Sequence, residues 1–191
     1  MVLAAGGSDR LGQPKQLLRR RSNTLLFQTT ALAQRITPGR VTVVLGAHHL
    51  RLRRILNQSG CKAKSVYNRH WQAGMAGSLL LGLGALPAQA EAALVLLCDQ
   101  ALVDFRDLCR LTKAWRGRPD RPAAAAYSDQ LGVPAIIPAR CWPSLTTLTG
   151  DRGAGPWLNA RSQSVTRISM PSAAFDVDTP SQLVQLKKLG R

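Results

Sequence analysis

The chain has 191 residues, of which 26 are Lys or Arg and 10 are Asp or Glu, so its formal net charge is +16. This length suits one domain, and a hydrophobic content of 45% is enough for a packed core. No apolar run approaches the roughly 18–20 residues that a membrane span needs, and the first residues lack the basic region of a signal peptide. We therefore expect one cytoplasmic domain over residues 1–191 with no membrane contact.

The positive charge comes mainly from arginine, with 20 Arg against 6 Lys. Such an excess suits either a binder of nucleic acid or another anionic surface, or an ordinary enzyme with an arginine-rich surface. The basic residues are scattered in short groups rather than gathered in one tail, and few aromatic residues lie among them. This scattering favours a solvated surface over a nucleic-acid interface.

Apolar runs typical of strands alternate with stretches of helical spacing. The expected strands lie at residues 1–5, 41–45, 63–67, 93–98, 123–127, 133–137 and 164–169. The expected helices lie at residues 23–36, 48–57, 78–86 and 104–115, with a last helix that has Thr179 as N-cap, Pro180 at its first position and Gly190 at its end. This alternation predicts an α/β sandwich with a mainly parallel sheet. Because the chain begins only two residues before Leu3, we expect either a truncated first strand or a start further upstream.

The most informative segment runs from Leu3 to Lys15, where the first strand turns through glycines and carries two cations. Glycines let backbone N–H groups approach an anion closely, and Arg10 and Lys15 can neutralise phosphate oxygens. The spacing of Gly7 and Gly12 is that of a P-loop, but Gln13-Pro14 stands where Lys-Ser/Thr would be needed, which excludes a Walker A site. The alternative is a plain glycine turn with two surface cations.

Carboxylates follow two of the later segments. Asp99 comes directly after the strand at 93–98, at the sheet edge where open α/β folds bind ligands, and it is suited to hold Mg²⁺ bound to phosphates. Asp176 and Asp178 lie two residues apart on an extended segment, so both side chains point the same way and suit a cation. The alternatives are that Asp99 caps a turn and that Asp178 assists the cap of the last helix.

Two glycine-rich segments complete the set of candidate site elements. Gly74-Met75-Ala76-Gly77-Ser78 opens a helix, and its small residues and free N–H groups suit either a close-fitting wall, an anion site or a plain helix entry. Residues 150–155 form a flexible loop before a short helix. The four cysteines and three histidines show no zinc spacing, and we expect reduced thiols.

Six blocks along the chain resemble those of a known enzyme group. The pattern Leu3-Ala-Ala-Gly-x-x-x-Arg10-x-Gly12-x-x-Lys15 resembles the signature loop of nucleotidyltransferases that use a nucleoside triphosphate and release pyrophosphate. The later blocks fall in the same order as in the molybdenum cofactor cytidylyltransferases of the MobA-like NTP transferase family: Gly74-Met-Ala-Gly-Ser78-Leu79, Cys98-Asp99-Gln100, Tyr127-x-x-x-x-Gly132-x-Pro134, Gly150-Asp-Arg-Gly-Ala154 and Asp176-Val-Asp-Thr-Pro180. The resemblance spans Leu3 to Pro180.

The resemblance implies a Rossmann-like three-layer sandwich of the nucleotide-diphospho-sugar transferase type and a transfer of CMP from CTP to the phosphate of a molybdopterin acceptor. It implies catalytic roles for Arg10, Lys15 and Asp99, and a Mg²⁺ ion held by Asp99 and Asp178, with Asp151 and Asp176 as the alternatives for the second ligand. The nucleotide contacts that it implies are Leu3, Ala4, Ala5, Gly6, Gly7, Arg10, Lys15, Gly74, Met75, Gly77 and Ser78. The partners that it implies are small-molecule substrates. It also allows a transient contact with a molybdoenzyme or its chaperone.

Three positions depart from the family pattern. Ala101 replaces a Pro, Val133 replaces a His, and Gly155 stands where an Arg is common. We expect the last two to lie near the acceptor, so they leave its identity open, as the sequence also leaves open GTP in place of CTP. A further alternative is a non-catalytic protein that binds nucleic acid or a partner enzyme through its basic surface.

Overall fold

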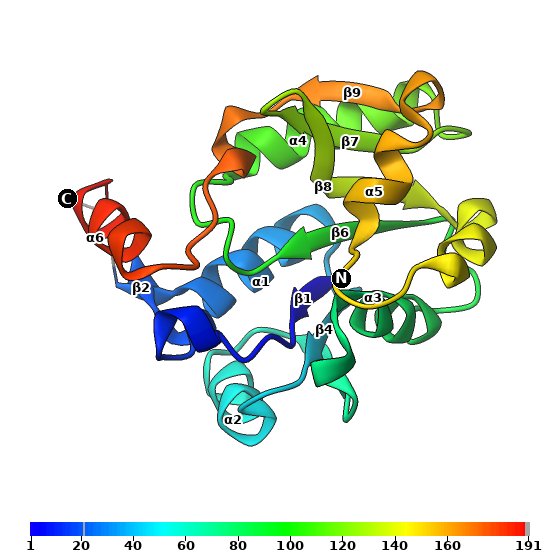
Figure 1. Cartoon of the computed structure of the whole chain (residues 1–191). Helices are drawn as coiled ribbons and strands as arrows, with labels where there is room; N and C mark the ends of the chain where they lie inside the picture. The colour runs from blue at the N-terminus through cyan, green and yellow to red at the C-terminus, as the bar shows by residue number, and fades with distance from the viewer. Residues whose placement is uncertain (21, 190–191) are drawn as a thin grey trace.

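A computed structural model describes residues 1–20 and 22–189 and has a seven-stranded sheet at its centre (Figure 1). The strands are β1 (Val2–Ala4), β2 (Arg19–Arg20), β3 (Asn23–Thr24), β4 (Val41–Leu45), β5 (Ala63–Tyr67), β6 (Ala92–Leu97), β7 (Ala123–Tyr127), β8 (Gln130–Pro138) and β9 (Thr166–Ser169). The α-helices are α1 (Leu25–Ile36), α2 (His49–Gln58), α3 (Met75–Gly84), α4 (Phe105–Gly117), α5 (Ala154–Asn159) and α6 (Pro180–Leu189). Among the described residues, no helix has the length and apolar character needed to cross a membrane.

The strand order of the central sheet is β5-β4-β1-β6-β8-β7-β9, and β2 pairs with β3 apart from it. Strands β5, β4, β1 and β6 are parallel to one another, and β8 runs antiparallel to β6 and β7. The continuous apolar sequences of β4 and β6 suit strands that are covered on both faces. The expected α/β fold with a mostly parallel sheet is confirmed.

Two apolar cores cover the two faces of the sheet, which makes the three layers. One core contains side chains of α1, α2 and α4, and the other contains side chains of α3 and α5. Side chains of β1 alternate between them, with Val2 in the first core and Leu3 in the second. Figure 1 shows α1 and α4 on one side of the sheet and α3 and α5 on the other.

The parallel strands bring several loops to one edge of the sheet. Ala4 lies beside Leu45, and Leu3 lies beside Leu97, so β1, β4 and β6 end together. The glycine loop after β1 and the Asp99 segment after β6 therefore meet at the carboxyl edge, as expected for a ligand site in an open α/β sheet.

Several boundaries differ from the sequence prediction. The helix expected at 23–36 begins at Leu25, because the Thr24 side chain accepts a hydrogen bond from the Phe27 N–H (3.2 Å) and the two residues before the helix pair with β2. The helix expected at 78–86 begins at Met75, because Gly74 takes a positive φ of 108° that starts it. The strand expected at 133–137 extends from Gln130 to Pro138, and a tight turn at Ser128 and Asp129, both with positive φ, joins it to β7.

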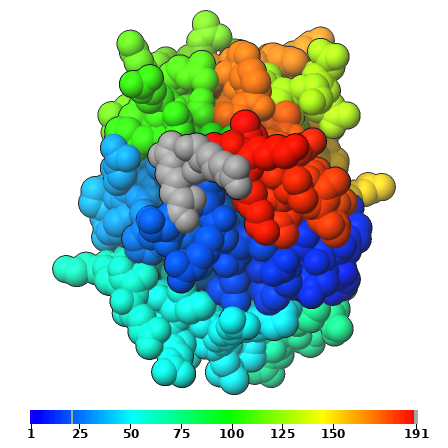
Figure 2. Space-filling view, turned by 90° about the vertical axis from the view of Figure 1, so that its left-hand side faces the viewer, coloured from blue at the N-terminus to red at the C-terminus, as the bar shows by residue number. Residues whose placement is uncertain are grey.

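The two ends of the chain pack against each other through a small third core. This core joins Leu11 and Leu18 of the first segment to Val177 and Leu186 near the end. Figure 2 shows α6 lying against the surface of the N-terminal segment. Thr179 caps α6 as expected, because its Oγ1 accepts from the Gln182 N–H (3.4 Å) while Gln182 Oε1 accepts from the Thr179 N–H (2.9 Å). The expected end at Gly190 lies outside the described residues.

Candidate functional site

A cavity of about 510 Å³ opens at the carboxyl edge of the sheet, between the glycine loop and the start of α3. The predicted site residues that line it are Leu3, Ala4, Ala5, Gly6, Gly7, Lys15, Gly74, Met75, Ser78 and Asp99. Gln16, Trp71 and Gln72 also line it, and the sequence analysis did not single them out. The cavity therefore brings together blocks that are separated by more than 90 residues of sequence.

The other predicted site residues lie beside this cavity or away from it. Arg10 and Asp178 line an adjacent hollow of about 230 Å³, which Gly6 and Lys15 share with the larger cavity. Gly77 does not line either space, and a side chain added there would approach only the amide of Asn68. Of the unusual positions, Val133 is buried in an apolar core and does not line the cavity, and neither does Gly155.

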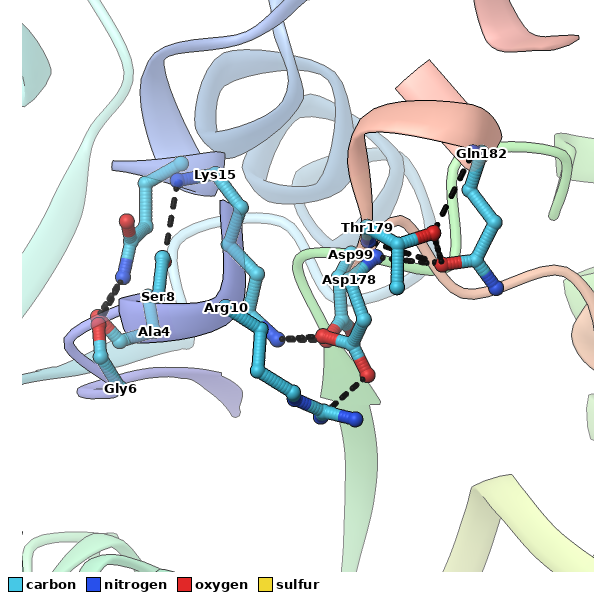
Figure 3. Close-up of polar contacts among 10 residues, drawn as sticks. Ala4, Gly6, Ser8, Arg10, Lys15, Asp99, Asp178, Thr179 and Gln182 are labelled. Carbon is cyan, nitrogen blue, oxygen red and sulfur yellow. Dashed lines mark hydrogen bonds and ion pairs between the residues drawn. The ribbon is translucent and has the colours of Figure 1, made fainter. Parts of the chain in front are cut away.

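Where the two hollows meet, two cations face two carboxylates (Figure 3). Lys15 Nζ donates to Asp99 Oδ2 and to Asp178 Oδ1, the second at 2.9 Å. Arg10 NH2 donates to Asp178 Oδ2 at 2.9 Å. The side chains of Lys15 and Asp99 are only 18% and 10% exposed, so this pair is largely shielded from water. Asp178 uses its carboxylate for these cations, and only its backbone N–H, bonded to Gln182, supports α6.

The charges in this cluster shift one another's protonation. Burial disfavours the charged form of Lys15, but attraction to Asp99, with help from Asp178, outweighs it and raises the pKa of the ammonium. Hydrogen bonds and attraction from Lys15 and Arg10 outweigh burial at Asp178 and lower the pKa of its carboxyl. Burial and the charges of Asp99 and Asp178 raise the pKa of Asp176 to about 6. The cluster therefore holds Lys15 as a cation and Asp178 as an anion at neutral pH.

Cys98 lies in the wall of the cavity directly before Asp99. Burial, together with the charge of Asp99, raises the pKa of its thiol to about 12. A protonated thiol is a poor nucleophile at neutral pH. Cys98 is therefore poorly suited to act as a nucleophile.

Asp99 and Asp178 offer oxygen ligands that suit a divalent cation. Asp99 Oδ1 is buried and has no hydrogen-bond partner, and the other oxygens of the two carboxylates are held by Lys15 and Arg10. Over the described part of the chain, no group of three or more His, Cys, Asp or Glu residues is placed to hold a metal. Mg²⁺ is commonly bound by one or two carboxylates together with substrate phosphates, and the pair fits that role.

The glycine loop offers donors on one side and is held on the other. In the described structure, the backbone N–H groups of Gly6, Gly7 and Ser8 have no acceptor. Nε2 of the buried Gln16 donates to the carbonyl oxygens of Ala4 (3.1 Å) and Gly6 (2.8 Å). Free N–H groups beside Lys15 make a site for an anion. Only the position of Gln16 directly after Lys15 in the sequence could have pointed to it.

The opposite wall is built around the start of α3. A side chain on Gly74 would come within 2.2 Å of the Gly150 carbonyl carbon, and the Gly150 carbonyl accepts from the Ala76 N–H (3.0 Å). The two glycine-rich segments at 74–78 and 150–155 therefore touch. Ser78 Oγ accepts from Asn68 Nδ2 (2.9 Å), so a buried amide orients this hydroxyl. The hydrogen bond from Ala76 to Gly150 uses one of the first N–H groups of α3. This helix start is therefore a close-fitting wall rather than a fully open anion site.

Over the described residues, the fold and the site define an α/β protein with a glycine loop of unpaired N–H groups and a carboxylate–lysine cluster at the carboxyl edge of its sheet. Residues 1–165 match the family described as the MobA-like NTP transferase domain. The chain belongs to this family, and it is a protein of the nucleotidyltransferase type. Among curated proteins, no relative matches the sequence.

Solved structures agree with this assignment. Rv0371c from Mycobacterium tuberculosis H37Rv is 27% identical, with a TM-score of 0.80 over 98% of this chain and 96% of that one. A complex of Rv0371c with manganese is 26% identical, with a TM-score of 0.74 over 98% of this chain and 96% of that one. The 4-diphosphocytidyl-2C-methyl-D-erythritol synthase from Anaerococcus prevotii is 12% identical, with a TM-score of 0.77 over 100% of this chain and 94% of that one, and shares the fold.

Proposed function

We propose that the protein is a Mg²⁺-dependent cytidylyltransferase that transfers CMP from CTP to the phosphate of a molybdopterin-type acceptor and releases pyrophosphate. The observation that carries the proposal is the cavity whose walls are the glycine loop and the Gly74–Ser78 segment, with Lys15 and Asp99 also among its lining residues. Its volume of about 510 Å³ lies within the range of small-molecule sites. The four cysteines are all free, which agrees with the expected cytoplasmic setting.

In this proposal the walls bind the base and ribose, and the open end binds the triphosphate. The N–H groups of Gly6, Gly7 and Ser8, which lack protein acceptors, donate to phosphate oxygens. Lys15 and Arg10 neutralise the same phosphates. The acceptor phosphate oxygen forms a bond to the α-phosphorus, and the bond from that phosphorus to the α–β bridging oxygen breaks, so its electron pair leaves with pyrophosphate. Positioning and charge neutralisation supply the catalysis, since no side-chain nucleophile is needed.

Asp99 and Asp178 hold Mg²⁺ in this proposal. When bound, the ion would neutralise charge on the phosphates and help pyrophosphate depart. The unpartnered Asp99 Oδ1 supports the assignment, and the manganese complex of the similar protein Rv0371c supports a divalent cation in this fold. Because Lys15 contacts both carboxylates, it would have to release oxygens that the ion uses, and its ammonium would then be available to the triphosphate.

The acceptor is the least constrained part of the proposal. The ordered blocks support a molybdopterin phosphate, while the replacements at Val133 and Gly155 keep another small phosphate acceptor as an alternative to test. GTP is a separate alternative for the donor. A transient contact with a molybdoenzyme or its chaperone would deliver the product.

The test measures pyrophosphate release with CTP, GTP, ATP and UTP, each with Mg²⁺ and with molybdopterin or a sugar phosphate as acceptor. We expect release with CTP and molybdopterin, and we expect Asp99→Asn to lower the rate about 100-fold or more. Asp120→Asn, an exposed carboxylate with 64% side-chain exposure, is the control and should keep the wild-type rate. Release with another pair would reassign the substrate, and wild-type activity in Asp99→Asn would exclude the proposed metal site.

A further inference from the structure

We propose that Gln16 is a positioning residue for the nucleotide: its buried side-chain amide sets the direction of the backbone N–H groups that bind the triphosphate. This inference rests on the proposed function, since it assigns a role within the same site. Gln16 lies in the cavity wall but is 0% exposed, and in this assignment it acts through the backbone that it holds rather than as a nucleotide contact.

The side-chain amide of Gln16 binds the carbonyl groups of the glycine loop. Nε2 donates to the carbonyl oxygens of Ala4 at 3.1 Å and of Gly6 at 2.8 Å, which uses both of its N–H groups. The carbonyl between them, that of Ala5, accepts from the Ala47 N–H at 3.0 Å. Three successive carbonyl groups are therefore held by the protein.

Holding these carbonyls also aims the N–H groups of the same peptide units. In a planar trans peptide the N–H points opposite to the C=O of the preceding residue. The Gly6 carbonyl points at Gln16, so the N–H of Gly7 points away from it. This N–H has no acceptor in the described structure, and Gly7 lines the 510 Å³ cavity. Gln16 therefore presents a free donor to the space where the nucleotide is proposed to bind.

The position of Gln16 also links this donor to the charged cluster. Gln16 follows Lys15 on the short helical segment Lys15–Leu17, and the Lys15 N–H donates to Ser8 Oγ at 3.1 Å. One short helical segment thus carries both the ammonium proposed to neutralise the phosphates and the amide proposed to orient the loop. A nucleotide that contacts the Lys15 ammonium and the Gly7 N–H would therefore depend on the relative position of Lys15 and Gln16.

A second glutamine in the same protein is a matched control. Gln100 is 4% exposed, and its Nε2 also donates to two carbonyls, those of Val133 (2.8 Å) and Ala173 (2.9 Å). The Oε1 atoms of Gln16 and Gln100 are both buried without a hydrogen-bond partner in the described structure. The groups that Gln100 holds do not line the cavity. Gln16 and Gln100 therefore share their local chemistry and differ in which backbone they position.

The experiment compares Gln16→Met with Gln100→Met, since methionine keeps the length of the side chain and removes the donors. Calorimetry measures the Kd of CTP, GTP, ATP and UTP with Mg²⁺, and separately the Kd of Mn²⁺ without nucleotide. We expect Gln16→Met to weaken the best-bound triphosphate about tenfold or more and Gln100→Met to weaken it less than about threefold. Neither variant should change the Mn²⁺ affinity, which a general loss of structure would lower.

The outcomes separate this inference from the proposed function. If the wild type binds none of the four triphosphates, the proposed function is wrong and the inference falls with it. If the wild type binds one of them and both variants weaken it equally, or neither does, the inference alone is overturned. Should Gln16→Met fail to fold, the side-chain amide signals of the wild type in ¹⁵N NMR decide: those of Gln16 should shift on titration with CTP and those of Gln100 should not, and unchanged Gln16 signals would overturn the inference.

Discussion

At the scale of single residues, Lys15 is the centre of the site because it stands between two acids. It contacts Asp99 and Asp178, which come from segments 84 and 163 residues away in the sequence. A lysine at this point occupies the carboxylate oxygens that a divalent cation would also use. In the absence of ligand, Lys15 would therefore compete with the proposed metal ion for these oxygens. In the proposed function it would also bind the phosphates.

Replacing Lys15 by methionine should destabilise the free protein and strengthen metal binding. The buried Asp99 would lose its counter-charge, which should cost about 2 kcal/mol or more in the free energy of unfolding. Mn²⁺ should restore more stability to Lys15→Met than it adds to the wild type, because it no longer has to displace the ammonium. Urea unfolding at pH 7 with and without Mn²⁺, and Mn²⁺ titration calorimetry, measure both effects.

Arg10→Met is the matched control for this prediction. Among the described residues, the one ion pair of Arg10 is with Asp178, and its side chain is 74% exposed, so its loss should cost less than about 1 kcal/mol. If Lys15→Met binds Mn²⁺ more weakly than the wild type, the competition between lysine and metal does not exist.

At the scale of secondary-structure elements, helix starts decide how the loops at the carboxyl edge are held. Helix α4 begins with a capping box in which Asp104 accepts from the Asp107 N–H and Asp107 accepts from the Asp104 N–H. The Asp107 carboxylate also accepts from Arg110 and from Ser172. Helix α3 begins instead with a glycine pressed against the Gly150 segment.

The Asp107 network predicts a stability that depends on pH. Burial raises the pKa of Asp107, but the hydrogen bonds from Ser172, Arg110 and the Asp104 N–H together outweigh it and hold this pKa below its ordinary value. Because the folded state favours the anion, this stabilisation is present above about pH 4 and is lost as the pH falls through the lowered pKa. Asp107→Asn should cost about 1–2 kcal/mol at pH 7, and the difference should shrink below pH 4 in denaturant unfolding. Asp120→Asn, which changes an exposed carboxylate outside this network, is the control variant.

The start and the end of α3 should respond to alanine in opposite ways. Gly74 has a φ of 108° and no room for a side chain, so Gly74→Ala should destabilise the protein by about 2 kcal/mol or more and displace the Gly150 segment. At Gly84, in the last turn, an added methyl group meets nothing within 4 Å, so Gly84→Ala should stabilise by about 0.5–1 kcal/mol. Thermal unfolding of both variants tests this contrast, and equal effects would show that the packing at Gly74 does not constrain α3.

At the scale of the whole molecule, charge is distributed unevenly along the chain. No Asp or Glu lies between Asp9 and Glu91, although half of the 26 basic residues lie there. The exposed Arg51, Arg53 and Arg54 of α2 belong to this stretch, and α2 follows β4, whose end lies beside the end of β1 at the carboxyl edge. A positive field at this edge would attract a polyanionic nucleotide.

Replacing Arg51, Arg53 and Arg54 by glutamate should slow the association of CTP about threefold or more at low ionic strength. The dissociation rate should stay nearly unchanged. The control reverses Arg116, Arg118 and Arg121, which lie at or after the far end of α4, for the same change in net charge. Stopped-flow fluorescence at several salt concentrations measures the rates. Equal slowing in both triple variants would attribute the effect to net charge alone.

The amino-acid sequence by itself determines the parts of this protein that depend on local composition. Strand burial, helix capping and turn chemistry depend on neighbouring residues. The sequence therefore predicts the buried strands β4 and β6, the Thr179-Pro180 cap and the glycine loop after β1. It also places Asp99 at the carboxyl edge, because a parallel strand precedes it. The single domain, the substrates and the roles of the site residues stay predictions.

Only the tertiary structure decided which distant groups meet. Lys15 forms an ion pair with Asp99 and Asp178 because the ends of β1 and β6 are neighbours and the segment before α6 returns to them. Packing between segments that are distant in sequence also decides three other features. These are the antiparallel direction of β8, the contact of Gly74 with Gly150, and the burial of Gln16 against the glycine loop. Local patterns carry no record of such contacts, because burial and counter-charge at one residue are supplied by the rest of the fold.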